Sequence, residues 1–243
     1  MTLKSKIKLT YFPARCLGEP IRFMLAYLGK EFEDHRCSAE EWLRIKHIEL
    51  TSACVPATPW GKVPVLEIDG QQVTQNIPIV RYLGKEAGLG GKDNWEDLRI
   101  DEIVSVIDEF RVELAKHHSQ NYAKENPISK DHFFNEKIPF YMKKLDAHIK
   151  KNNGYLANGK LSWADLYFGA MIEHMTDIHG SDITVGYPNI KVLKERVFTL
   201  PQIKAWLDKR PEDSYKWLLF INFFKKETVN KYLNFFKKGT VNK

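Results

Sequence analysis

One stretch near the start decides the fold: residues 7–28, IKLTYFPARCLGEPIRFMLAYL. Its first five residues alternate apolar and polar side chains, and this period of two predicts a strand. From Gly18 to Leu28 the apolar residues recur at helical spacing, and Gly29 is placed to end a helix there. A strand that leads directly into a helix is typical of the beginning of an α/β domain.

The pattern continues in the same way to residue 88. Ser38 and Glu41 have the spacing of a capping box, which predicts a short helix through Lys46. Asp69-Gly70 is a strong hairpin turn signal between two short apolar segments. The predicted elements are strands at 31–36, 64–68 and 72–74 and a helix at 77–87. The expected order is therefore β-α-β-α-β-β-α over residues 1–88.

A glycine-rich segment, GLGGK at 88–92, marks the domain boundary. Strand signals are missing after it, and residues 95–211 predict an all-α second domain. One apolar stripe runs from Ile100 to Leu114 at helical spacing, and Ser162 and Asp165 have the spacing of another capping box. The remaining helices are expected at 131–151, 162–177, 188–198 and 201–210.

Composition excludes several classes of protein. The chain has 243 residues, of which 43% are hydrophobic, enough to bury a sizeable core. Its longest apolar runs, such as 217–221, have about a third of the length that a membrane span needs. The N-terminus has no apolar signal segment, and three cysteines form no CxxC motif. These features predict a cytoplasmic protein.

The net charge of +6 belongs to the C-terminal tail. From residue 217 onward there are six lysines and one acid, a net +5, which leaves +1 for residues 1–216. A nearly neutral body argues against nucleic acid as a partner. The tail, residues 212–243, also holds a near repeat, NFFKKETVNK and NFFKKGTVNK. We expect it to be poorly ordered and not to contact membranes.

Several candidate site residues lie near the predicted sheet edge. Tyr11 ends the first strand, at the edge where open α/β sheets bind ligands. Val63-Pro64 opens a strand, where a cis bond can turn backbone amides toward a ligand. Gln75 and Asn76 precede a helix, and free N–H groups at a helix N-terminus favour a carboxylate. An indole and two cations complete the set: Trp42, Lys46 and Lys62.

Together these motifs resemble the sigma class of cytosolic glutathione transferases, which includes glutathione-dependent prostaglandin D synthases. The resemblance covers about residues 5–211. It rests on residues 9–22 (LTYFPARCLGEPIR), Glu41-Trp42, 61–66 (GKVPVL), 74–76 (TQN), 161–165 (LSWAD), 203–206 (IKAW) and 209–211 (KRP). It implies a thioredoxin-like N-terminal domain, an all-α C-terminal domain and a homodimer. It also implies glutathione as co-substrate, with no metal expected.

The resemblance assigns roles to individual residues. Tyr11 would hydrogen-bond the glutathione sulfur and stabilise the thiolate. The peptide part of glutathione would contact Trp42, Lys46, Lys62, Val63, Pro64, Gln75 and Asn76, with Glu109 reaching across from the partner subunit. The pocket for the second substrate would use Phe12, Arg111, Tyr167 and Met171.

Four positions depart from the pattern of the class. Asn76 stands where serine is usual, Leu17 where some relatives have arginine, and Glu109 where aspartate is common. Trp60 replaces the phenylalanine or tyrosine that plugs the partner subunit. The segment between Lys46 and Gly61 is also longer than usual, and we expect an insertion at about 47–58.

The expected function is conjugation of glutathione to hydrophobic electrophiles. Two alternatives stay open: a prostaglandin-H2 D-isomerase type of activity, and a non-catalytic, crystallin-like or ligand-carrying relative. Arg111 and Lys116 predict a basic pocket wall, which argues against efficient prostaglandin isomerisation. Cys16 is a rival nucleophile, although it is one residue out of register with the cysteine of related thioredoxin-fold transferases.

Overall fold

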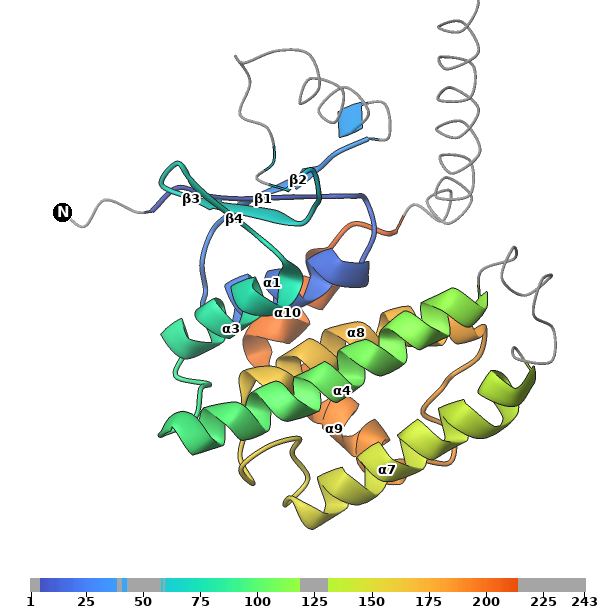
Figure 1. Cartoon of the computed structure of the whole chain (residues 1–243). Coiled ribbons are helices and arrows are strands. Elements are labelled where there is room, and N and C mark those ends of the chain that lie inside the picture. Colours follow the sequence, from blue (N-terminus) through green and yellow to red (C-terminus); the bar gives the residue numbers. More distant parts are fainter. Residues whose placement is uncertain (1–4, 39–40, 43–57, 59, 119–130, 214–243) are drawn as a thin grey trace, which may run out of the picture.

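The computed structural model describes residues 5–38, 41–42, 58, 60–118 and 131–213. A small sheet forms the first layer, two helices lie beneath it, and a helical domain lies beyond them (Figure 1). The predicted fold class is therefore confirmed: a thioredoxin-like N-terminal domain followed by an all-α domain.

The sheet has four strands in the order β2-β1-β3-β4. They are β1 (Ile7–Tyr11), β2 (Glu33–Arg36), β3 (Val65–Ile68) and β4 (Gln71–Thr74). Strand β1 pairs in parallel with β2 and antiparallel with β3. Ile7, Leu9 and Tyr11 face the protein interior, because side chains two apart on a strand share a face. The last residue of β1, Tyr11, therefore enters the protein between sheet and helices.

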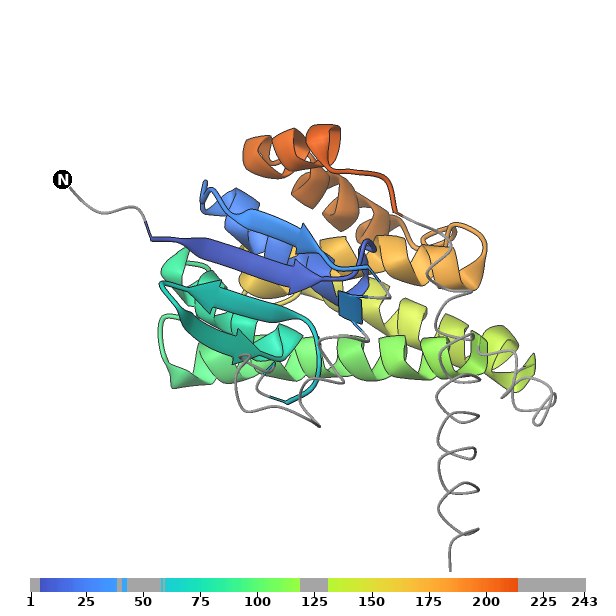
Figure 2. The same ribbon diagram turned by 90° about the horizontal axis from the view of Figure 1, so that it is seen from above.

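Helices α1 (Glu19–Tyr27) and α3 (Asn76–Glu86) cover one face of this sheet (Figure 2). A 3₁₀ turn, η1 (Cys16–Gly18), joins the loop after β1 to α1. The buried side of α1 consists of Ile21, Phe23, Met24 and Leu25, which have no exposed surface. Their burial anchors α1 and fixes the position of the loop that leads from Tyr11 into the helix.

The second domain is helical wherever it is described. Its central pair, α4 (Asn94–His118) and α8 (Trp163–His179), pack against each other, and α8 also contacts α1. The apolar stripe predicted on residues 100–114 is buried, which confirms it. The other elements are the π-helical turn η2 (Phe133–Lys137), α7 (Ile138–Lys151), α9 (Pro188–Phe198) and α10 (Pro201–Lys209). None of the described helices is both long and apolar enough to cross a membrane.

Local differences from the expected elements have physical reasons. The helix expected at 131–151 is interrupted by η2, because Pro139 has no N–H to continue the α-helical ladder. Ser38 Oγ accepts the Glu41 N–H at 3.1 Å, as predicted, but the Glu41 carboxylate bonds His35 Nε2 at 2.8 Å. The rest of the helix through Lys46, most of the insertion and the tail from 214 lie outside the described residues.

Candidate active site

Tyr11 is packed tightly at the end of β1 and is 4% exposed. A Cβ on Gly18 would lie 2.5 Å from the tyrosine Cδ1, so only glycine leaves room for this ring. The Leu17 N–H donates to the Tyr11 hydroxyl oxygen at 3.3 Å. Since the oxygen accepts this bond, the hydroxyl hydrogen is free to donate elsewhere.

The acidity of the phenol follows from its surroundings. Burial is the largest cause and raises the pKa of Tyr11 well above its ordinary value of 10.0. The neighbouring Cys16 raises that pKa further, whereas the Leu17 amide and the Arg22 charge lower it. Tyr11 is therefore a neutral hydrogen-bond donor at physiological pH and cannot serve as a base.

The sulfur of Cys16 lies beside this hydroxyl. Burial acts to raise the pKa of the thiol, but the charge and hydrogen bond of His174, the hydrogen bond to Tyr11 and the charge of Arg111 outweigh it. They lower the pKa from 9.0 to about 7. The Cys16 backbone has a φ of 30°, a left-handed conformation that is uncommon for residues other than glycine. Four elements thus meet around one half-buried thiol: β1, η1, α4 and α8.

Asn76 is a buried amide whose polar atoms are not satisfied by the described residues. It begins α3 and is 6% exposed, yet neither its amide nitrogen nor its oxygen has a hydrogen-bond partner among the described residues. An unsatisfied buried amide is destabilising unless a ligand or water completes it. The preceding residue, Gln75, is exposed and has a φ of 74°, a strained conformation of the kind found at binding sites. The Val63–Pro64 bond is cis, as predicted.

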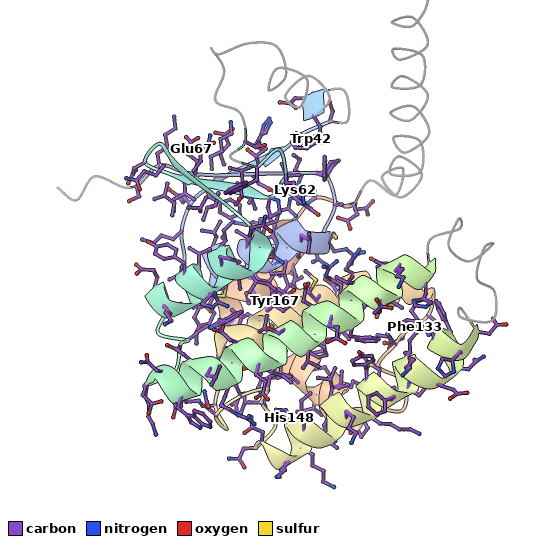
Figure 3. The ribbon with its side chains drawn as sticks, viewed as in Figure 1. Trp42, Lys62, Glu67, Phe133, His148 and Tyr167 are labelled. Carbon is purple, nitrogen blue, oxygen red and sulfur yellow. The ribbon has the colours of Figure 1, made fainter. Side chains whose placement is uncertain are left out.

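The remaining predicted contacts are only partly brought together. The Trp42 ring meets Phe12 edge to face at 5.7 Å, and Phe12 in turn lies 5.3 Å from Tyr11. Lys62 is exposed, and Figure 3 shows it with Trp42 on the sheet side of the molecule. Lys46 lies outside the described residues.

The predicted second-substrate residues lie at two depths. Tyr167 and Met171 have no exposed surface and belong to the core, whereas Phe12 is half-buried. Arg111 Nε donates to Asp108 Oδ1 at 2.7 Å, and the Tyr167 hydroxyl donates to the same oxygen at 3.1 Å. Burial raises the pKa of Tyr167 far above 10.0. Tyr167 and Met171 are therefore part of the core and do not line an open surface.

Comparisons with known proteins place this site in a family. Residues 7–85 match the glutathione S-transferase N-terminal domain, and residues 108–210 match the glutathione S-transferase C-terminal domain. The chain is 39% identical over 212 residues to glutathione S-transferase S1 of Drosophila melanogaster, covering 86% of this chain and 80% of the relative. The chain belongs to the glutathione S-transferase family. It is a glutathione transferase, and the predicted resemblance is confirmed.

Several relatives of this transferase are described as prostaglandin D synthases. Hematopoietic prostaglandin D synthase of Gallus gallus is 34% identical over 209 residues, which are 84% of this chain and 96% of the relative. The structure of prostaglandin synthase D of Nilaparvata lugens is 47% identical, with a TM-score of 0.77, and covers 85% of this chain and 99% of that one. The fold match thus extends over both domains.

Two residues near the site of the transferase were missed in the sequence. His174 contacts the Cys16 sulfur and follows Tyr167 and Met171 at seven and three residues, the spacing of one helix face. Asp108 pairs with Arg111 from three residues away on α4. Both residues lie at helical spacing from predicted site residues, but this spacing does not say which helix face meets the loop after β1.

Glu109, predicted to reach glutathione from the partner, is exposed and accepts a bond from the Tyr141 hydroxyl at 2.9 Å. This contact joins α4 to α7 within one subunit. A role across a dimer interface therefore requires the carboxylate to leave Tyr141 or to share its second oxygen.

Proposed function

We propose that this transferase activates the thiol of glutathione through Tyr11 for attack on hydrophobic electrophiles. The observation that carries the proposal is the buried Tyr11 hydroxyl, which accepts the Leu17 N–H at 3.3 Å and lies beside the Cys16 sulfur, so that its own hydrogen can be donated to a thiol. His174, Tyr11 and Arg111 lower the pKa of the Cys16 thiol to about 7 against the effect of burial. In the proposed mechanism a glutathione thiol at the same hydroxyl meets the same hydrogen-bond donor. An ordinary thiol has a pKa of about 8.5, so a similar shift makes thiolate a major form at neutral pH.

The proposed reaction is a nucleophilic substitution by the glutathione thiolate. The glutathione thiol takes the place of Cys16 at the Tyr11 hydroxyl and loses its proton to solvent. Tyr11 donates to the resulting thiolate, since its own high pKa keeps its proton in place. The sulfur forms a bond to the electrophilic carbon, and the leaving group departs with its electron pair. The donor stabilises negative charge without being consumed.

We assign the peptide part of glutathione to the residues around the start of α3. The unpartnered Asn76 amide and the N-terminus of α3 suit the γ-glutamyl end, next to Gln75. The backbone of Val63, before cis-Pro64, suits the cysteinyl unit. Trp42, Lys46 and Lys62 suit the glycyl carboxylate, because an indole N–H and ammonium groups are donors.

We further propose a homodimer. Trp60 is 74% exposed, and Trp95 and Leu98 on α4 are 68% and 53% exposed. These exposed apolar side chains are the candidates for the dimer contact that the resemblance implies. Trp60→Ala should convert a dimer to a monomer in size-exclusion chromatography with light scattering. We also infer that the protein functions in the cytoplasm, where free thiols such as those of Cys16 and Cys37 stay reduced. The proposed reaction requires no metal.

The test of the proposed activity combines binding and turnover. The purified protein should bind immobilised glutathione and conjugate glutathione to a generic aryl halide. Binding without turnover would instead support the ligand-carrying alternative. Asn76→Leu should weaken glutathione binding by about tenfold or more, because it removes the amide that a ligand would complete. Glu86→Leu, on the exposed end of the same helix, provides the control.

A second candidate activity is isomerisation of prostaglandin H2 to the D form. The observation that favours it is the Arg111–Asp108 ion pair at 2.7 Å, which compensates the charge that the sequence predicted for the pocket wall. Several of the relatives also carry this activity in their names. Incubation of the protein with prostaglandin H2 and glutathione, followed by product analysis, tests it. If the analysis finds non-enzymatic products alone, this activity is ruled out.

A further inference from the structure

The Arg22 side chain is the most completely buried cation of the described residues, and the proposed function gives it no role. It has no exposed surface and lies on α1, directly behind the Tyr11 loop. Its guanidinium Nη1 donates to the carbonyl of Ala14 at 2.9 Å, and Nη2 lies 3.5 Å from the carbonyl of Phe12. A planar guanidinium has fixed donor directions, so these bonds define the path of the chain just after Tyr11.

Arg22 also touches the Tyr11 ring itself. The guanidinium carbon lies 5.9 Å from the ring centroid, within the range of a cation–π contact. The ring also meets Gly18, where a Cβ would lie 2.5 Å from Tyr11 Cδ1 and 3.1 Å from Arg22 Nη1. Tyr11 is thus packed against both the Gly18 backbone and a buried cation, and its hydroxyl position depends on both.

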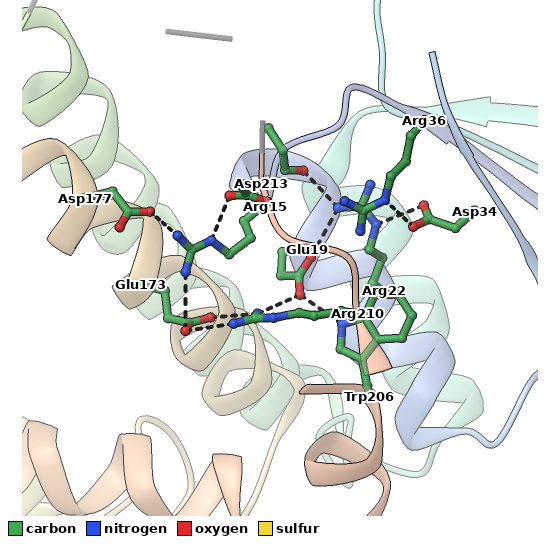
Figure 4. A network of polar contacts seen from close by, with 11 residues as sticks. Arg15, Glu19, Arg22, Asp34, Arg36, Glu173, Asp177, Trp206, Arg210 and Asp213 are labelled. Atoms are coloured by element: carbon green, nitrogen blue, oxygen red, sulfur yellow. Dashed lines mark hydrogen bonds and ion pairs between the residues drawn. The ribbon is translucent and has the colours of Figure 1, made fainter. Parts of the chain in front are cut away.

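The charge of Arg22 is held in place by two carboxylates. Nε donates to Asp34 Oδ1 at 2.9 Å, and Nη1 bonds Glu19 Oε2 at 3.1 Å. Glu19, also fully buried, accepts bonds from Trp206 and Arg210 of the second domain, both at 2.9 Å. Figure 4 shows this chain of contacts from α10 through Glu19 to Arg22 and Asp34. Such a network fixes the guanidinium far better than a single ion pair would.

We propose that Arg22 is a positioning residue for Tyr11, which sets the placement of the hydroxyl and thereby the acidity of the thiol bound there. The inference rests on the proposed role of Tyr11. The other groups facing the site are Cys16 on η1, Arg111 on α4 and His174 on α8, and they stay unchanged when Arg22 is replaced. Arg22 does not touch the reacting sulfur. It acts through its contacts with the Tyr11 ring and with the backbone carbonyls of Phe12 and Ala14.

The test is the pH dependence of kcat/KM for an aryl halide at saturating glutathione, because its rising limb reports the bound thiol. Arg22→Lys keeps the charge but loses the planar fork. The double variant Glu19→Gln/Arg22→Gln removes the cation together with the buried carboxylate that pairs with it. We expect the midpoint of the rising limb to move to higher pH, by about half a pH unit in Arg22→Lys and by about one pH unit in the double variant. At pH values below the limb, the double variant should then lose about tenfold in kcat/KM.

A purely structural role would not move the limb, since fewer folded molecules lower the rate by the same factor at every pH. Arg210→Lys is the matched control: it weakens the same Glu19 network but touches none of residues 11–14. Its limb should match that of the wild type. Ultraviolet absorbance of the bound thiolate gives a second reading for variants with low activity.

An unmoved limb in both Arg22 variants, with folded protein, would overturn the inference. An equal shift in Arg210→Lys would also overturn it, because the effect would then belong to network stability. Failure of the proposed function gives a different result: Tyr11→Phe would leave the limb of the wild type in place.

Discussion

Tyr11 gains its chemical character from its neighbours and not from the residue type. Its ring is held by Gly18 and Arg22, and its oxygen accepts the Leu17 amide, so one hydrogen points to the site. We expect Tyr11→Phe to lower turnover by about 10–100-fold, or about 1.4–2.7 kcal/mol of transition-state stabilisation. Glutathione affinity should change little, because the peptide contacts remain.

Steady-state kinetics and equilibrium titration with glutathione check this prediction. Tyr155→Phe is the control, since that ring packs under Arg196 in the helical domain, 4.4 Å from the guanidinium carbon. Unchanged turnover in Tyr11→Phe would remove Tyr11 from the mechanism and favour Cys16 as the nucleophile.

Cys16 and Cys37 should differ sharply in reactivity. The pKa of Cys16 is about 7, whereas burial raises the pKa of Cys37 to about 12. Only the thiolate reacts with haloacetamides, so alkylation of Cys16 should rise with pH around 7 while Cys37 stays unmodified. Mass spectrometry of the labelled peptides measures both sites in one sample. Glutathione should protect Cys16 if it displaces that sulfur from Tyr11.

The same geometry predicts that Cys16→Ser keeps its activity. In the proposed mechanism Cys16 competes with glutathione for the Tyr11 hydroxyl, and its removal leaves the donor in place. Turnover should therefore stay within about threefold of the wild type, a change of about 0.7 kcal/mol or less. Loss of turnover by a factor comparable to that in Tyr11→Phe would contradict this assignment.

At the scale of single elements, α8 shows how one cap controls a buried helix. The Asp165 carboxylate accepts the Ser162 and Leu156 N–H groups at 2.7 and 2.8 Å, and it also accepts the Ser162 hydroxyl at 2.9 Å. Burial still outweighs these bonds and raises the pKa of Asp165 from 3.8 to about 6. The folded protein therefore binds this proton more tightly than the unfolded chain does.

The sign of the resulting pH effect follows from linkage. Stability from a raised carboxyl pKa is fully present below about pH 3.8 and is lost as the pH rises through about 6. Asp165→Asn cannot titrate, so the stability advantage of the wild type over this variant should shrink by about 2–3 kcal/mol between pH 4 and 7. Urea denaturation at both pH values measures it, with the exposed Asp208→Asn as control. An advantage that grows with pH would contradict the assigned pKa.

The elements were largely predictable because their signals are local. The alternation in β1, the stripe on α4 and the caps around Ser162 all follow from neighbours in sequence. The catalytic surroundings were predictable only in part. His174 reaches Cys16, and Glu19 reaches Trp206 and Arg210, across contacts between distant segments that no periodicity records. The π-helical turn before α7 was also missed, although Pro139 offered a signal.

At the scale of the whole molecule, a cluster of ion pairs joins the two domains beside the site. Arg15, next to Cys16, bonds Asp177 at 2.6 Å and Asp213 at 2.8 Å and lies 3.4 Å from Glu173. Asp213 was assigned to the tail from the sequence, yet its side chain is only 17% exposed in this contact. The last described residue is therefore part of the folded body and helps to hold the loop after Tyr11.

This contact determines where the tail can be removed. Truncation after Asp213 deletes seven lysines and one glutamate, which takes the formal charge from +6 to zero, and it keeps the Arg15 pair. We expect the dimer and the turnover to persist, because the deleted repeat lacks a pattern that would bury a face. Truncation after Pro211 also deletes Asp213 and should lower stability by about 1–2 kcal/mol, a fall in Tm of a few degrees. Comparing the two truncations by calorimetry and kinetics separates the tail from the Arg15 contact. Equal stability of the two would show that the Asp213 pair contributes nothing. Binding of the full chain to anionic vesicles, lost in both truncations, would instead make the tail a membrane-binding segment.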